Sequence, residues 1–505
     1  MTVKSVCISV SAPKAIILIC FLLSAKYVAA QDPVRWTPLV PKKNVYDQFQ
    51  NLDSNFFIGR AMKDGIFIFN EENGAVNSIK SQVGYTRLFY GFDVLTVGGI
   101  VYKIEQKKEG DQHVVKLEAV DKNTLERTDV IKTLLTDELL DDRLANHYTV
   151  SVNSRHLFLT RYSNETFYVA VFNAATLEPV YRQQAVCKAN GVSYYPNQFT
   201  FSENGEVDMI CLRMNGKNTV IVEAIMNSEG LTFGEETELE HFYPQSIALL
   251  KQGEREFIQL VASDQGHNGL PSGIISLEMN FPAIAEISTE PITQGLLAKD
   301  LDTEHKAELL AGHTSGSKMP KELVPENYTA ATHLLADGSF ITVHQGYTYL
   351  ENDQYSALAC NNFFIVKTDT DGKVEWVQFA RSDFHVGTIE QQYGFNYSYL
   401  DQDGKLCILF NEPKQLYNDN GKYISEKAIE KQVYFGDNLS RFMACAMIRL
   451  NTVTGEYIRQ LVPTPAADFI AMPGQVVQSG DHVLIYGSNA KKECFGEIQQ
   501  SLSGK

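Results

Sequence analysis

The feature that most limits the possible folds is a repeated pair of short apolar strands joined by a tight polar turn. The clearest copy runs from Phe363 to Gln378 (FFIVKTDTDGKVEWVQ). Both of its runs have the apolar patterns of β-strands, and the Asp-Gly pair between them is typical of a hairpin turn. Relatives of this unit recur along nearly the whole chain, which indicates a repeat protein.

The repeats fall into opening hairpins and closing hairpins. The opening hairpins span residues 94–104, 150–160, 199–212, 247–261, 332–343, 397–410 and 476–487. Six of them are followed by a closing hairpin, which begins at Val114, Phe167, Thr219, Ser272, Phe363 or Ala446. Four-strand units repeated in this way are typical of β-propellers. The sequence therefore predicts an all-β fold, a seven-bladed β-propeller, with six to eight blades possible.

The two ends of the chain are expected to share one blade. After the last opening hairpin only one further strand pattern follows, Lys491 to Gln500. A closing hairpin without an opening partner stands near the N-terminus, from Asp64 to Ile79 (DGIFIFNEENGAVNSI). Pairing these two segments gives a split closing blade, which completes the ring and removes exposed sheet edges.

The first thirty residues have the features of a signal peptide. A basic start precedes the apolar stretch Ala15 to Ala25, and small residues end at Ala30, after which cleavage is predicted. No later segment reaches the length of a transmembrane helix. The expected divisions are a signal peptide (1–30), an N-terminal lead-in (31–63), one propeller domain (64–500) and a tail (501–505). We expect a secreted, periplasmic or cell-surface protein.

Three inserts interrupt the repeat, at residues 293–327, 344–359 and 411–442. The first contains LLAKDLDTEHKAELLAG, whose leucines are spaced as in a short amphipathic helix. Inserts in repeat proteins often build binding surfaces, and they equally often serve only packing. Both interpretations of these three stay open.

Charge and motifs exclude several classes of function. The formal net charge is −17, and the signal segment contributes only lysines, so the mature chain is more acidic still. Such a chain repels nucleic acid and anionic membranes. The turns TDTDG, DQDG and NDNG resemble calcium loops, but Lys367 and Leu416 stand where a first ligand is required. No metal and no cofactor is expected.

Six cysteines remain after the signal segment, and their pairing is left open. They are Cys187, Cys211, Cys360, Cys407, Cys445 and Cys494. Export permits disulfides in an even set of this kind. Cys211, Cys407 and Cys445 lie inside apolar strand patterns, which favours buried free thiols at those positions.

The closing unit resembles the repeat of pyrroloquinoline quinone-type and kelch-like propellers, in which a strand, an Asp-x-x-x-Gly turn and a Trp connect neighbouring blades. Lys367 to Trp376 matches this repeat, and Leu450 to Tyr457 matches it without the Trp. Trp376 is the one tryptophan of the blades, and neither vicinal cysteines nor a calcium site accompanies it. The resemblance therefore implies the fold and no quinone-dependent redox activity. The order of apolar, charged and turn residues in the repeats of the mature chain is also similar to that of secreted propellers of Bacteroidota, which implies a bacterial exported protein.

A polar and aromatic group of residues is the candidate ligand-binding site. Its members are His344, Tyr347, Tyr349, Tyr355, Arg381, Asp383 and His385. They fall on one insert and just after a closing strand of the same blade, and such side chains are favoured at recognition surfaces. The alternative is that Asp383 caps a turn while the tyrosines cover blade edges. No catalytic residue can be assigned.

Two functions are consistent with these features. The first is a non-catalytic binding or assembly module for a protein or glycan partner at the cell surface. The second is a propeller enzyme, a hydrolase or lyase, that acts on a glycan or small metabolite in the central channel. The sequence has no nucleophile, nucleotide or metal motif, and this favours the first function. The host organism and the oligomeric state stay open.

Overall fold

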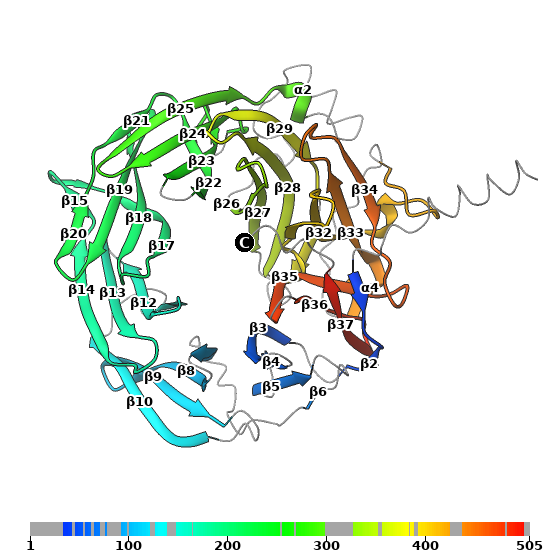
Figure 1. The fold of residues 1–505 in the computed structure, drawn as a ribbon, viewed down its shortest axis with the longest axis horizontal. Coiled ribbons are helices and arrows are strands. Elements are labelled where there is room, and N and C mark those ends of the chain that lie inside the picture. The colour runs from blue at the N-terminus through cyan, green and yellow to red at the C-terminus, as the bar shows by residue number, and fades with distance from the viewer. Residues whose placement is uncertain are drawn as a thin grey trace, which may run out of the picture.

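The computed structural model of the 505-residue chain describes residues 34–42, 46–53, 56–61, 65–70, 76–77, 92–97, 100–121, 127–138, 148–163, 165–252, 255–266, 269–297, 327–351, 356–382, 384–387, 392–424, 437–479 and 482–498. Nearly all regular structure in these residues is antiparallel β-sheet. The sheets stand side by side around a ring, each with one edge toward the centre (Figure 1). This is a β-propeller, as the repeats predict.

Eight sheets of the described residues have four or five strands, and they are termed blades 1 to 8 in ring order. Blade 1 has β3 (Tyr46–Asp53), β4 (Phe56–Ala61), β5 (Gly65–Asn70) and β6 (Val76–Asn77). Blade 2 has β7 (Phe92–Val97), β8 (Ile100–Glu109), β9 (Gln112–Val120) and β10 (Arg127–Glu138). Blade 3 has β11 (Thr149–Val152), β12 (His156–Ser163), β13 (Thr166–Asn173) and β14 (Pro179–Val186). Blade 4 has β17 (Tyr195–Phe201), β18 (Val207–Asn215), β19 (Asn218–Asn227), β20 (Gly230–Phe233) and β21 (Thr237–Leu239).

The second half of the ring consists of blades 5 to 8. Blade 5 has β22 (Tyr243–Gln252), β23 (Arg255–Ser263), β24 (Gly273–Asn280) and β25 (Ala283–Pro291). Blade 6 has β26 (Asn327–Leu334), β27 (Phe340–Glu351), β28 (Ser356–Thr368), β29 (Val374–Ala380) and β30 (Phe384–Gly387). Blade 7 has β31 (Tyr397–Leu400), β32 (Leu406–Pro413), β33 (Met443–Leu450) and β34 (Tyr457–Leu461). Blade 8 has β35 (Ile470–Ser479), β36 (His482–Ser488), β37 (Lys492–Ile498), β1 (Val34–Trp36) and β2 (Val40–Pro41).

A few short elements lie outside the blades. They are the hairpin β15 (Lys188–Ala189) and β16 (Val192–Ser193), the helices α2 (Gln294–Leu297) and α4 (Asp437–Phe442), and the 3-10 turn η4 (Lys414–Leu416). Helix α2 falls at the start of the helical insertion expected within residues 293–327, and the rest of that insertion lies outside the described residues. Within the described part of the chain, no helix is long and apolar enough to cross a membrane.

All seven predicted opening hairpins are confirmed as the first two strands of blades 2 to 8. An eighth opening hairpin, β3–β4, lies within the segment 31–63 that was assigned to a lead-in. Strand β3 departs from regular pairing twice, between Asp47 and Gln50 and between Asn51 and Asp53. Such bulges break the period-two pattern by which strands are recognised in a sequence. The eight sheets are therefore at the upper end of the predicted six to eight.

The chain ends do share a blade, but the N-terminal partner is not the hairpin 64–79. Strand β1 forms the outer edge of blade 8, where Val34 pairs with Ile498 and Trp36 with Gly496. Strand β5 instead pairs with β4 on one side and with β6 on the other, and so these strands complete blade 1. A strand of three residues thus closes the ring, and its shortness explains why no periodic pattern indicated it.

The three Asp-Gly and Asn-Gly turns that resemble calcium loops have one common geometry. The side-chain Oδ1 atoms of Asp369, Asp401 and Asn418 each accept hydrogen bonds from the backbone N–H groups two and four residues later. Gly372 has a φ of +84°, a conformation that glycine adopts without strain. These side chains therefore build hairpin turns, and among the described residues no group of three or more potential ligands is placed to hold a metal ion.

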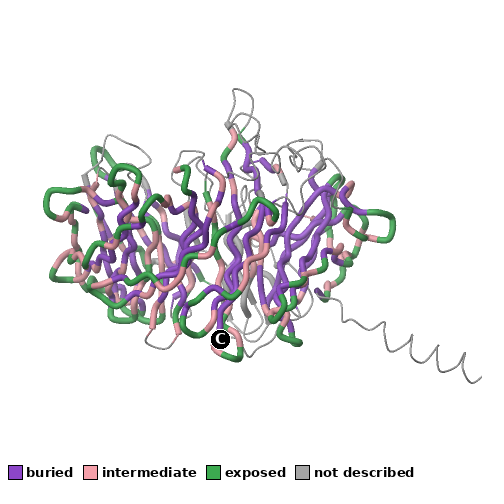
Figure 2. The backbone as a smooth tube through the Cα atoms, turned by 90° about the horizontal axis from the view of Figure 1, so that it is seen from above, coloured by how far each residue is buried: buried purple, intermediate pink, exposed green. Residues whose placement is uncertain are grey.

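Apolar side chains fill the spaces between blades. Between blades 3 and 4, for example, Phe158 and Val171 pack with Met209 and Cys211 in one buried cluster. Figure 2 shows buried backbone running through the blades, with exposed turns at their ends. The six cysteines contribute to this interior as buried free thiols. The disulfide question is thereby answered in favour of thiols, because none of the six is paired.

The two ends of the blades form two different faces of the ring. Since adjacent strands are antiparallel, the turns between first and second strands lie on one face, termed the turn face. The connections between second and third strands, and from each blade to the next, lie on the opposite face, termed the insertion face. The described ends of all three predicted inserts lie on the insertion face, because the inserts join β25 to β26, β27 to β28 and β32 to β33.

The closing strand gives the first prediction. Val34 is buried in the cluster that joins blades 7 and 8, whereas its neighbour Arg35 is exposed. Val34→Asp places an unpaired carboxylate in this cluster and should lower the free energy of unfolding by roughly 3–5 kcal/mol. Arg35→Ala, on the opposite side of the same strand, should change it by less than about 0.5 kcal/mol. Urea denaturation of both variants checks this, and equal stabilities would contradict ring closure through β1.

Candidate ligand-binding groove

A groove with a volume of about 1330 Å³ lies along blade 7. It extends from the β31–β32 turn to the segment after β32, and the chain between β34 and β35 forms its other side. Strand β34 has five residues and ends at Leu461, while its neighbour β33 has eight. The first part of β33 therefore extends past β34, and this leaves room for the groove. Its volume exceeds the ~300–1,000 Å³ typical of sites for small ligands.

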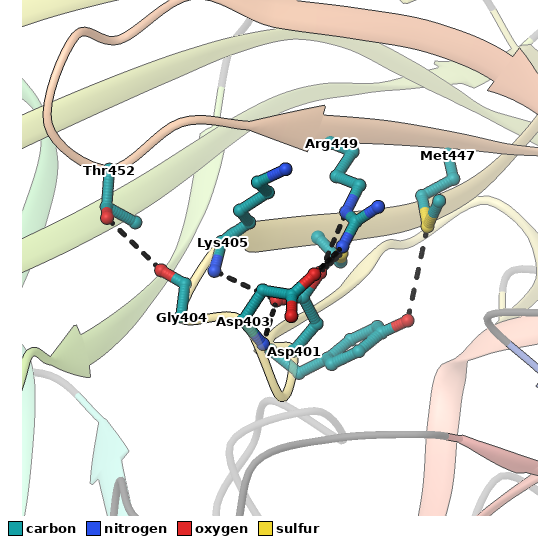
Figure 3. A network of polar contacts seen from close by, with 9 residues as sticks. Asp401, Asp403, Gly404, Lys405, Met447, Arg449 and Thr452 are labelled. Carbon is teal, nitrogen blue, oxygen red and sulfur yellow. Dashed lines mark hydrogen bonds and ion pairs between the residues drawn. The ribbon is translucent and has the colours of Figure 1, made fainter. Parts of the chain in front are cut away.

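One end of the groove is formed by Asp401, Asp403 and Arg449 (Figure 3). Asp401 Oδ1 accepts the backbone N–H groups of Asp403 and Lys405, both at 2.9 Å. Its Oδ2 accepts Arg449 Nε at 2.8 Å, and Arg449 Nη2 also donates to Asp403 Oδ2 at 2.8 Å. Burial by itself lowers the pKa of Arg449, but hydrogen bonding to Asp401 and its charge outweigh burial, and the pKa is raised. Figure 3 shows the second terminal nitrogen of Arg449 pointing away from both carboxylates.

The other end is held by Lys414. Its Nζ donates to the carbonyl oxygens of Ser440 (2.9 Å), Arg441 (3.2 Å) and Ala467 (2.7 Å). These acceptors belong to helix α4 and to the connection between β34 and β35, so one ammonium group joins three segments of the chain. An ammonium has three N–H donors, and all three are used in this way.

A buried ion pair anchors the rim of the groove. Glu412 in β32 is 0% exposed and accepts hydrogen bonds from Arg459 Nε, at 2.9 Å, and from Arg459 Nη2. Tyr417 OH also donates to Glu412, and the Arg459 guanidinium lies 4.0 Å from the centre of the Tyr423 ring. The rim segment 417–423 is therefore attached at both of its ends to the same pair of charges.

The rim itself is a tight turn that presents polar side chains to the groove. Backbone bridges join Tyr417 to Tyr423 and Lys422 to Gln460, which fixes the turn against β34. Asn418, Asp419 and Asn420 line the groove at this turn, and Gln460 lines it from β34. Amide groups both donate and accept hydrogen bonds, so this rim offers both kinds of contact.

The inner wall is apolar and depends on the closing strand. Tyr399, Cys407 and Met447 line the groove and belong to the cluster shared with blade 8. Burial raises the pKa of the Cys407 thiol to about 12, so this thiol stays protonated. Trp36 of β1 contacts Phe469 edge to face at 5.0 Å, and its Nε1 donates to the carbonyl of Pro463 at 2.9 Å. Both of these partners line the groove.

The candidate residue His344 lies in the interior and not at this groove. It is 0% exposed, with Nδ1 at 2.7 Å from Ser246 Oγ and Nε2 at 3.0 Å from Gln259 Oε1. Because the Gln259 oxygen can only accept, Nε2 carries the proton and Nδ1 accepts from Ser246. Burial lowers the pKa of His344 to about 3. His344 therefore forms a neutral contact between blades 5 and 6.

The other candidate residues are only partly brought together. Tyr347 contacts Tyr349 edge to face with ring centres 5.8 Å apart, and Tyr349 is 48% exposed. Arg381 is buried on the side of blade 7, where its carbonyl accepts a hydrogen bond from Arg459. His385 is half-buried in β30. Tyr355 and Asp383 lie outside the described residues, and these assignments stay predictions.

The groove was not found from the sequence, although parts of it were visible. The turns DQDG and NDNG and the insert 411–442 were all recognised, and they supply Asp401, Asn418 and Lys414. Arg449 and the 460–469 segment carry no motif of their own. Only the pairing of β32 with β33 brings these positions together across the long insert.

Comparisons with known proteins do not assign this chain to a family. No protein-family model matches the sequence, and no curated protein matches it. Among solved structures, the chain is similar to the Dos1 propeller, with 7% identity and a TM-score of 0.46 over 93% of this chain and 96% of that chain. It is also similar to the WD40 propeller domain of Doa1, with 9% identity and a TM-score of 0.33 over 92% and 97%. Polysaccharide lyase Uly1 gives 10% identity and a TM-score of 0.37 over 84% and 93%.

Replacing Glu412 should show how strongly the rim depends on its ion pair. Glu412→Gln leaves Arg459 buried without its counter-charge and should lower the free energy of unfolding by roughly 3–5 kcal/mol. The double variant Glu412→Leu/Arg459→Met removes both charges, and its free energy of unfolding should fall by less than that of Glu412→Gln. As a control, Lys132→Ala breaks the exposed pair with Glu178 and should cost under about 1 kcal/mol. Chemical denaturation measures all three, and a Glu412→Gln loss no larger than the control would contradict the anchoring role.

His344 should make stability depend on pH. Between pH 6.5 and 5 the unfolded chain binds a proton at His344 and the folded chain does not. The contribution of His344 to the free energy of unfolding is therefore lost as the pH falls. Burial raises the pKa of Asp208 to about 6 and that of Glu223 to about 7, and these two groups stabilise the folded chain as the pH falls. Because they are present in both proteins, the test compares the unmodified protein with a His344 variant. As the pH falls through this range, the difference in free energy of unfolding between the unmodified protein and His344→Gln should shrink by up to about 1.4 kcal/mol per pH unit. A difference that stays constant in urea denaturation across the range would show that His344 does not titrate in this way.

Proposed function

We propose that this chain is an exported, non-catalytic β-propeller that binds a protein or glycan partner at the cell surface, and that the blade 7 groove holds the partner. The observation that carries the proposal is the groove itself, which combines a volume of about 1330 Å³ with polar ends fixed by hydrogen bonds. Side chains already held in place lose little freedom when a ligand binds, and this favours affinity.

The pairing of the charged groups supports binding over catalysis. Lys414 donates to three carbonyl groups, and Arg449 is held by Asp401 and Asp403. A general acid or base must exchange its proton with the substrate, and its hydrogen bonds must allow that. Of these two groups, Arg449 can still orient a ligand, through the terminal nitrogen that points away from both carboxylates (Figure 3).

Features of the sequence support export. Residues 1–30 have the basic, apolar and small-residue regions of a signal peptide. The resemblance to secreted Bacteroidota propellers favours the periplasm or the outer surface of a bacterium. Burial raises the pKa of thiols such as Cys445, to about 12, which protects them from oxidation in such a compartment.

Blocking the groove tests the function. Ala467 is exposed at the groove, and its carbonyl still accepts from Lys414 when the side chain changes. Ala467→Trp should reduce capture of extracellular glycan or protein from the producing cells at least tenfold, because the indole occupies the groove. Ala285→Trp, on the exposed face of β25, is the matched control and should capture as the unmodified protein does.

The captured material decides between binding and catalysis. Mass spectrometry of the released ligand should give the same mass before and after incubation. Capture that Ala467→Trp leaves unchanged would contradict the groove as the site. Conversion of the ligand into shorter products would contradict a non-catalytic role.

A further inference from the structure

We propose that the ligand of the blade 7 groove is a neutral oligosaccharide, an inference that rests on the function proposed above. Three properties of the groove point to this class of ligand: the balance of its charges, the amide groups of its rim, and its combination of an apolar wall with polar ends.

The charges of the groove disfavour an anionic ligand. Its lining contains the carboxylates of Asp401, Asp403 and Asp419, and the cations of Lys414 and Arg449. The acids outnumber the bases, and the whole chain has a formal net charge of −17. An acidic ligand would therefore enter a region of like charge.

The same pairing also limits what a cationic ligand would gain. Asp401 accepts two backbone N–H groups through Oδ1 and Arg449 through Oδ2. Asp403 accepts Arg449 as well. Both carboxylates thus already share one guanidinium as a hydrogen-bond donor, and a ligand cation would have to compete with this group, which is held in place.

The amide groups of the lining suit hydroxyl groups. Gln402, Asn420 and Gln460 line the groove, and an amide side chain both donates and accepts hydrogen bonds. The terminal nitrogen of Arg449 that points away from the carboxylates adds a further donor (Figure 3). A sugar hydroxyl likewise donates and accepts, so each hydroxyl can pair with either type of atom on the rim.

The shape of the groove favours a chain of sugars over a single small molecule. A sugar ring has apolar faces of C–H groups and a polar edge, which match a wall of Met447 and Val462 beside a polar rim. The volume of about 1330 Å³ is above the range of single small ligands, ~300–1,000 Å³, and leaves room for several connected rings.

Isothermal titration calorimetry with defined probes tests the proposal. The probes are neutral hexasaccharides of β-1,4-glucan, α-1,4-glucan, β-1,4-mannan and β-1,4-xylan, with hexagalacturonate as the anionic counterpart and hexalysine as the cationic one. At least one neutral probe should bind the unmodified protein and Ala285→Trp equally, and bind Ala467→Trp at least tenfold more weakly. Gln460→Leu keeps the size of the side chain and removes its amide, so it should weaken binding roughly tenfold, the effect of one hydrogen bond. The Kd should not change between low and high NaCl, because a neutral ligand is not screened.

The outcomes separate this inference from the proposed function. Binding of hexagalacturonate or hexalysine in preference to every neutral probe, with sensitivity to Ala467→Trp, would overturn the ligand class and leave the groove as a binding site. Failure of every neutral probe to bind would also overturn the ligand class, while capture from extracellular material decides the binding function independently. Neutral probes that bind Ala467→Trp as tightly as the unmodified protein would overturn both.

Discussion

Apolar contact between neighbouring blades is the constraint on which the whole structure depends. Blade 4, for example, is buried on both faces, because Met209 of β18 packs in the cluster shared with blade 3 and Ile210 in the cluster shared with blade 5. A sheet of this kind needs a blade on either side, and only a closed ring gives every blade two neighbours. The cluster between blades 7 and 8 shows what this requires, since it contains residues of β31 to β33 together with Val34 of β1 and Ile485 of β36. The groove is built on the outside of this same interface. Its inner wall is therefore as firmly fixed as the ring itself.

Buried polar contacts add specificity to this apolar packing. His344 of blade 6 bonds to Ser246 and Gln259 of blade 5. Tyr148, just before blade 3, donates to Asp137 of blade 2, and Arg161 lies over its ring at 4.8 Å. We interpret these contacts as fixing the register between adjacent blades, because a buried polar group that loses its partner is costly. The histidine was chosen from the sequence as a ligand-binding residue, and its burial shows that residue type alone does not separate these two roles.

The parts of this fold that could be predicted are those encoded locally. Tight turns such as TDTDG use residues whose side chains bond to their own backbone, and alternating strands on either side of them give a clear period. Strand β1 and the bulged β3 have no such pattern, so the closing strand and the eighth sheet were misassigned. The groove was missed for a different reason. Arg449 and Asp401 are far apart along the chain and meet only after β31, β32 and β33 have assembled. No sequence motif indicates this contact.

The pairing of β1 with β37 also sets an order of events. The hydrogen bond from the backbone N–H of Phe495 to Thr37 Oγ1 joins residues 458 positions apart. A ribosome adds residues one after another, so β1 must wait without its partner until the last blade has been made. Over that interval the contact between Trp36 and Pro463 cannot exist, and the wall of the groove is incomplete. A chain of this design acquires its complete groove only after β37 has been made, and a nascent molecule that still lacks this strand has no finished site to occupy.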